Sequence, residues 1–116
     1  MVKEMRKALL LVVLMLPMPT LAQSDQALFE EAAAMCAAQL AIAGGMSENG
    51  LSTMVFTRDG RWFRQMLVEL TSKAEASRRI EQHAKNIQED WNSGNLTWDG
   101  LLQIAAKCSQ LKLTFE

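Results

Sequence analysis

The sequence has 116 residues, of which 49% are hydrophobic and 22% are charged, and its formal net charge is −1. This composition is typical of one globular domain and excludes a disordered chain. The small net charge gives no support for a nucleic-acid-binding protein, so we expect no nucleic-acid partner. The chain is therefore expected to fold around a hydrophobic core of its own.

The first 22 residues have the three parts of a secretory signal peptide. A basic stretch, 3–7, precedes an unbroken apolar run, 8–16, and residues 20–22 resemble a signal-peptidase site. The apolar run is too short for an ordinary transmembrane helix, so we expect cleavage after residue 22 and no stable membrane anchor afterwards. Residues 23–116 would then form a single helical domain that is periplasmic or secreted.

Residues 24–45 carry the strongest helical pattern in the chain. Ser24 is the predicted N-cap, alanines dominate the interior, and Gly44 and Gly45 are expected to end the helix. The second half is apolar on almost all sides, which predicts a buried central helix. A helix that lies on a membrane surface is the less favoured alternative, because this stretch contains no Lys or Arg.

The segment from residue 46 to residue 60 is less regular. Residues 46–50 predict a polar turn, and residues 51–56 fit either a helical turn or an extended piece. Asp59 and Gly60 predict a second turn, because both residue types are common in turns and unfavourable inside helices. A new helix is therefore expected to begin near residue 61.

Residues 61–91 carry an apolar stripe at helical spacing. The motif S-x-x-E at 72–75 matches a capping box, so the stripe predicts either two helices or one long helix with an exposed turn. Thr97 is the predicted cap of a last helix, 98–110. The tail 111–115 alternates like a strand, and we expect it to pack as an extended segment.

The predicted fold is all-α: a small bundle of three or four helices stapled by one disulfide. Cys36 and Cys108 are the only cysteines, and each falls on an apolar helical face. Two cysteines in a small exported domain most often form a disulfide. Two buried free thiols are the alternative, and a redox-active pair is less favoured because the two cysteines lack the CxxC spacing.

No set of residues has the spacing of a known active site. His83 is the only histidine, and one histidine with scattered carboxylates gives neither a metal-binding pattern nor a Ser/His/Asp arrangement. We therefore predict no enzymatic activity, no cofactor and no metal. His83 is expected to be a partly exposed helical residue.

One short stretch is a candidate surface for partner binding. Arg58, Arg61 and Arg64 alternate there with Trp62 and Phe63. Arginine and aromatic side chains often provide most of the binding energy in contacts with anionic ligands and partner proteins. The simpler interpretation, which is favoured, places the aromatic residues in the core and leaves the arginines solvated or paired with nearby acids.

These observations favour a non-enzymatic interaction factor, such as an inhibitor, an immunity factor, a chaperone-like helper or an accessory subunit. Its partner would be another exported protein. The alternative is a binding module for a small apolar or anionic ligand, held in a pocket between helices. The sequence leaves the oligomeric state open.

Overall fold

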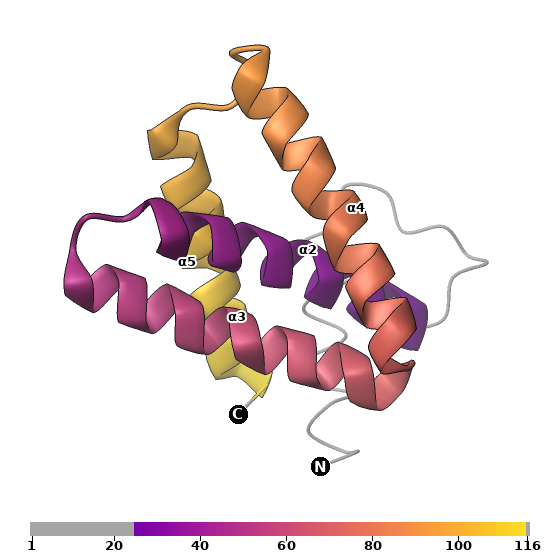
Figure 1. The fold of residues 1–116 in the computed structure, drawn as a ribbon. Helices are drawn as coiled ribbons and strands as arrows, with labels where there is room; N and C mark the ends of the chain where they lie inside the picture. Colours follow the sequence, from indigo (N-terminus) through magenta and orange to yellow (C-terminus); the bar gives the residue numbers. More distant parts are fainter. Residues whose placement is uncertain (1–24, 116) are drawn as a thin grey trace.

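A computed structural model describes residues 25–115, which form four α-helices and no strand (Figure 1). The predicted all-α bundle is confirmed, with four helices rather than three. The signal-peptide pattern and the predicted cap at Ser24 lie outside the described residues. The helices are α2 (Asp25–Met46), α3 (Gly50–Leu70), α4 (Lys73–Asn92) and α5 (Trp98–Phe115).

The central helix is α2, which packs against α3, α4 and α5. Phe29, Leu40 and most of its alanines are buried. Because alanine side chains are small, the neighbouring helices can lie close to its backbone. By length and composition, α2 is the one described helix that could cross a membrane, but 72% of its apolar window is buried inside the protein. Such burial is typical of the core helix of a bundle.

The first helix ends at Met46, one residue beyond the predicted end. The predicted role of Gly44 and Gly45 as a left-handed stop is wrong, because both are helical and neither has a positive φ. Gly44 is buried, and a Cβ atom at this position would lie 2.8 Å from Thr57 Oγ1 in α3. The glycine therefore allows a close contact between two helices and does not form a turn.

The predicted turn at Asp59 and Gly60 is also wrong, because α3 runs without interruption through both residues. A Cβ atom at Gly60 would lie 3.2 Å from the Cβ of Leu40, so this glycine also permits close packing on α2. Asp59 is buried, and its Oδ1 lies 3.4 Å from Lys112 Nζ in α5. These tertiary contacts outweigh the low helix propensity of the two residues.

Three helices begin at a capping side chain. Asn49 Oδ1 accepts hydrogen bonds from two backbone N–H groups in the first turn of α3. Ser72 Oγ accepts one from the N–H of Glu75, and Thr97 Oγ1 accepts one from the N–H of Gly100, each at 3.1 Å. The predicted caps at Ser72 and Thr97 are confirmed. The break at Ser72 separates α3 from α4, so the single long helix is excluded.

The predicted extended tail, 111–115, is wrong because α5 continues to its end. Leu111 and Lys112 are buried, and the ring centroids of Phe115 and Phe29 lie 4.7 Å apart. Leu111 and Phe115 are four residues apart, so the tail fits helical spacing as well as strand alternation. The contact with α2 decides in favour of the helix.

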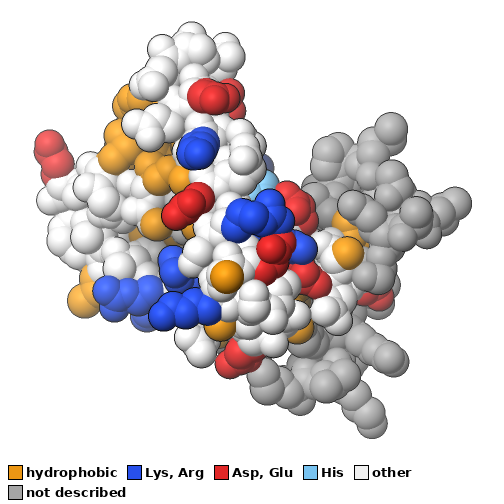
Figure 2. Space-filling view, turned by 45° about the vertical axis from the view of Figure 1, so that its right-hand side comes forward, with side chains coloured by type: hydrophobic (Ala, Val, Ile, Leu, Met, Phe, Trp, Pro, Cys, Tyr) orange, Lys and Arg blue, Asp and Glu red, His pale blue; other side chains and the backbone are white. Residues whose placement is uncertain are grey.

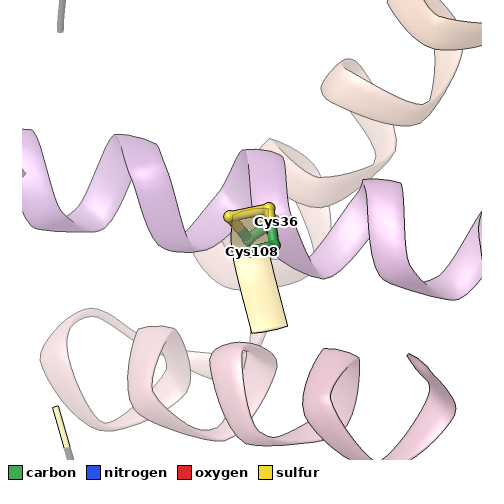
Figure 3. The surroundings of a disulfide bond; sticks show 2 residues. All are labelled: Cys36 and Cys108. Atoms are coloured by element: carbon green, nitrogen blue, oxygen red, sulfur yellow. A yellow bond between two sulfur atoms is a disulfide. The ribbon is translucent and has the colours of Figure 1, made fainter. Parts of the chain in front are cut away.

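A disulfide bond joins Cys36 of α2 to Cys108 of α5 (Figure 3). Both residues are buried, and their Cα atoms are 5.5 Å apart. The predicted staple is confirmed, and neither cysteine has a free thiol. The bond connects positions 72 residues apart, so it ties the first described helix directly to the last.

Candidate functional site

The three arginines of the predicted binding stretch lie on an exposed side of α3. Arg58, Arg61 and Arg64 are three residues apart, and residues at that spacing are neighbours on a helix surface. Trp62 is only half-buried and its ring centroid lies 5.0 Å from that of Phe63, which is fully buried. The structure thus brings the arginines together and places the two aromatic residues in or against the core.

The three guanidinium groups differ in their neighbours. Arg58 Nε donates a hydrogen bond to Asp59 Oδ1 at 3.1 Å, and Arg64 donates one to Ser77 Oγ at 3.1 Å. Among residues 25–115, no carboxylate forms an ion pair with Arg61 or Arg64. The positive charges of these two side chains are therefore not neutralised by a neighbouring acid.

Arg61 and Arg64 border a hollow of about 430 Å³ between α2, α3 and α4. Ile80 of α4 contributes an apolar side chain on the other side. The floor is made of small residues, so the backbone of α2 lies near the protein surface here. These floor residues are Ala37, Ala41, Gly44, Gly45 and Gly60.

A second hollow, of about 340 Å³, lies between α2, α4 and α5. It shares Ala41 and Gly45 with the first hollow, so the two adjoin over the C-terminal half of α2. Trp91 and Met46 remain 38% and 41% exposed, which is high for large apolar side chains beside a core. The other lining residues are Ile42, Ile87, Gln88 and Leu101.

We call the two adjoining hollows, together with Arg58, Arg61 and Arg64, the α3–α4 wedge. Figure 1 shows α3 and α4 diverging from their common corner, with the C-terminal half of α2 between them. In Figure 2, blue side chains gather at the lower left and orange side chains lie above them, with a red side chain between the two groups. The residues that line the wedge are arginines on the α3 side and mostly apolar residues on the α4 side.

All charged residues that line the wedge have the same sign. A third hollow, of about 460 Å³, extends along α3 from Arg61 past Arg58 to Met54. The charged side chains around the three hollows are Arg58, Arg61 and Arg64, with no acidic residue among them. The wedge therefore carries a local positive charge, although the net charge of the whole chain is −1.

A separate cluster of charged residues joins α2 to α4. Arg79 donates hydrogen bonds to Glu75 at 2.9 Å and to Glu30 of α2 at 3.0 Å. His83 is partly exposed, as predicted, and its Nε2 lies 2.7 Å from Glu31 Oε1. Between residues 25 and 115, no group of three or more His, Cys, Asp or Glu side chains is placed to hold a metal ion. The cluster is therefore best explained as a structural link.

Comparison with known proteins gives no assignment for this chain. No protein-family model, curated protein or solved structure matches it.

Sequence reasoning identified the arginine row but not the rest of the wedge. Ile87 and Trp91 fall within the apolar stripe predicted over 61–91, and the alanines of α2 are predicted as helix-forming residues. The available signal is the spacing of Ala37, Ala41 and Gly45, which are four residues apart. Residues at that spacing share one side of a helix, and small residues there leave its backbone accessible.

Proposed function

We propose that the protein is an exported, non-enzymatic interaction factor that binds a segment of another exported protein in the α3–α4 wedge. The observation that supports this proposal is the combination of exposed apolar side chains and unneutralised arginines around a floor of small residues. Contiguous exposed apolar surface with a polar border is typical of interaction sites.

The alternative, a pocket for a small ligand, has weaker support. Small-molecule sites bury about 70–90% of the ligand surface. The two hollows are partly open to solvent and adjoin at Ala41 and Gly45, so they form one continuous concave surface. Such a surface suits a partner chain better than an enclosed ligand.

Export is part of the proposal and has two sources of support. The bond between Cys36 and Cys108 is of a kind that persists in oxidising compartments and is rare in the cytosol. The signal-peptide pattern of residues 1–22 provides a route to such a compartment, and it lies outside the described residues. A partner would then be encountered outside the cytoplasm.

A matched pair of photo-crosslinking variants tests the proposal. Gln88 lines the wedge on α4, whereas Gln103 is exposed on α5 and lines neither hollow. Each glutamine is replaced in turn by p-benzoylphenylalanine in the full chain, and the cells that naturally make the protein are irradiated. We expect an adduct with a second exported protein from position 88 and not from position 103.

Two results would contradict the proposed function. The first is equal yields of the same adduct from both positions, because contact would then not be specific to the wedge. The second is the absence of any adduct from position 88. A small molecule that then co-purifies in stoichiometric amount would favour the small-ligand alternative.

A further inference from the structure

We infer that the segment bound in the wedge is an acidic amphipathic helix. This inference rests on the proposed function and specifies the chemistry of the partner at the same site. Three features of the wedge support it: the charge of the α3 edge, the apolar character of the α4 edge, and the small residues of the floor.

The α3 edge favours carboxylates. Arg58 and Arg64 are six residues apart, which corresponds to about 9 Å along a helix. Guanidinium groups bind carboxylates through paired hydrogen bonds. Among residues 25–115, no acidic side chain forms an ion pair with Arg61 or Arg64. Acidic residues three or four positions apart on a partner helix are separated by about 5–6 Å, so they can face successive arginines.

The α4 edge favours apolar side chains. Ile80, Ile87 and Trp91 line the two hollows from α4, and Ile42 and Met46 continue this apolar lining on α2. A helix bound in a groove presents apolar anchors at positions i, i+3 or i+4, and i+7. The partner therefore needs an apolar stripe beside its acidic stripe, which is the pattern of an amphipathic helix.

The floor of the wedge allows a helix to approach closely. Ala41 and Gly45 are exposed there and carry at most a methyl group. Helices pack with their axes about 8–10 Å apart, and the shorter distances require small side chains at the contact. An extended segment would instead need a sheet edge for pairing, and residues 25–115 contain no strand.

An anionic membrane surface would also attract arginines, but it fits the shape less well. Amphipathic helices bind bilayers by laying an apolar face into a flat interface. In this protein the arginines and the apolar side chains border hollows between two diverging helices. A concave surface of this kind is complementary to a narrow convex object such as a helix.

The experiment begins with the segment that is crosslinked to position 88. Tandem mass spectrometry gives its sequence, which we expect to carry net negative charge and apolar residues at a spacing of three and four. A labelled synthetic peptide of that sequence is then titrated against the full chain by fluorescence anisotropy. Its Kd should increase as salt is added, because salt screens exposed charges.

Charge reversal tests the role of the arginine edge. Arg61→Glu combined with Arg64→Glu should weaken peptide binding by roughly tenfold or more. The control, Lys85→Glu combined with Lys107→Glu, makes the same change of charge at exposed positions that do not line the wedge. This control should change the Kd by less than about twofold.

Thermal unfolding monitored by circular dichroism checks that the charge-reversal variants fold. If the double glutamate variant is unfolded, Arg61→Gln combined with Arg64→Gln serves in its place, because glutamine retains good helix propensity. This milder variant should still weaken peptide binding several-fold, while its melting temperature stays close to that of the native protein.

The possible outcomes separate this inference from the proposed function. A neutral or basic crosslinked segment, or equal weakening by the two double variants, would overturn the acidic-helix inference and leave the interaction function standing. An adduct with a second copy of the chain would indicate self-association instead. Binding to phosphatidylglycerol vesicles but not to the peptide would indicate a membrane surface. The absence of any adduct from position 88 would reject both proposals.

Discussion

Asp59 and Lys112 form an ion pair inside the bundle, where charged side chains rarely lie. The pair joins α3 to α5, and Arg58 Nε donates a further hydrogen bond to Asp59 Oδ1. Lys112 Nζ also lies 6.0 Å from the centroid of the Trp62 ring. If Lys112 is removed, the buried Asp59 carboxylate keeps only the hydrogen bond from the exposed Arg58. Part of its buried charge then lacks compensation, which destabilises the protein more than loss of the whole pair.

Lys112→Met should therefore lower the free energy of unfolding by about 3 kcal/mol. The double variant Asp59→Leu with Lys112→Met removes both charges, so it should recover most of that loss. Urea denaturation at neutral pH measures both quantities. A double variant less stable than Lys112→Met would show that the pair is not stabilised in the way described.

Gly44 and Gly45 are adjacent in α2 but have different surroundings. A Cβ atom at Gly44 would lie 2.8 Å from Thr57 Oγ1, whereas one at Gly45 would have no atom of the described residues within 4 Å. Both positions are helical, so alanine improves the helix propensity at each. Only at Gly44 does the added methyl group push against α3.

Gly45→Ala should raise the free energy of unfolding by about 0.5–1 kcal/mol, because alanine has less backbone entropy to lose. Gly44→Ala should lower it, since the contact with Thr57 must open. Thermal denaturation of the two variants under the same conditions gives the comparison. Stabilisation of equal size at both positions would mean that α2 and α3 are not in close contact at Gly44.

At the scale of helices, the elements predicted correctly are those whose signals are local. Ser72 and Thr97 are capping residues that act on backbone groups three positions away, so the sequence alone reveals them. Asp59 and Gly60 have local preferences for a turn. Their place inside α3 depends on Lys112 and Leu40, which are distant in the sequence.

The residues of the candidate site also differ in whether a local sequence signal can predict them. The arginine row could be predicted because Arg58, Arg61 and Arg64 belong to one segment. Trp91 and the floor at Ala41 could not be joined to this row, since three helices bring them together. Helical spacing places a residue on a face of its helix, but it does not reveal which neighbouring helix covers that face.

A charge network around Glu75 helps to hold α4 against α2. Hydrogen bonds from Arg78 and then Arg79 lower the pKa of Glu75 from 4.5 to about 2. Arg79 also donates to Glu30 of α2. Because the pKa is lower in the folded state, the stabilisation is fully present above about pH 4.5 and is lost as the pH falls toward about 2.

Glu75→Gln should therefore be less stable than the native protein at neutral pH, and the difference should disappear as the pH approaches about 2. Urea denaturation across this pH range measures the effect. Glu81→Gln is the control, since Glu81 is exposed on the same helix, and its effect at neutral pH should be smaller. A deficit for Glu75→Gln that stays constant down to about pH 2 would contradict this role.

At the scale of the whole molecule, the disulfide joins the two helices that α3 and α4 separate in the chain. Cys36 lies in α2 and Cys108 in α5, while α3 and α4 are attached by packing and ion pairs. The disulfide therefore holds α2 and α5 together, whereas α3 and α4 carry no disulfide cross-link. The wedge therefore opens directly beside the disulfide-closed core, with its floor on α2.

Cys36→Ser combined with Cys108→Ser should lower the free energy of unfolding by about 4 kcal/mol, from the loop-closure entropy of a loop of this length. Helical content should survive at low temperature, because the apolar stripes and caps remain. Circular dichroism during thermal unfolding measures both. An unchanged melting temperature would show that the bond does not contribute to the stability of the protein.

One measurement tests the proposed export together with closure of the bundle by the disulfide. It is the intact mass of protein taken from the exported fraction, denatured and alkylated without a reductant. We expect a chain that begins at Gln23 and carries no alkylated cysteine. A chain that begins at Met1 and carries two alkylated cysteines would contradict both the export and the closed bundle.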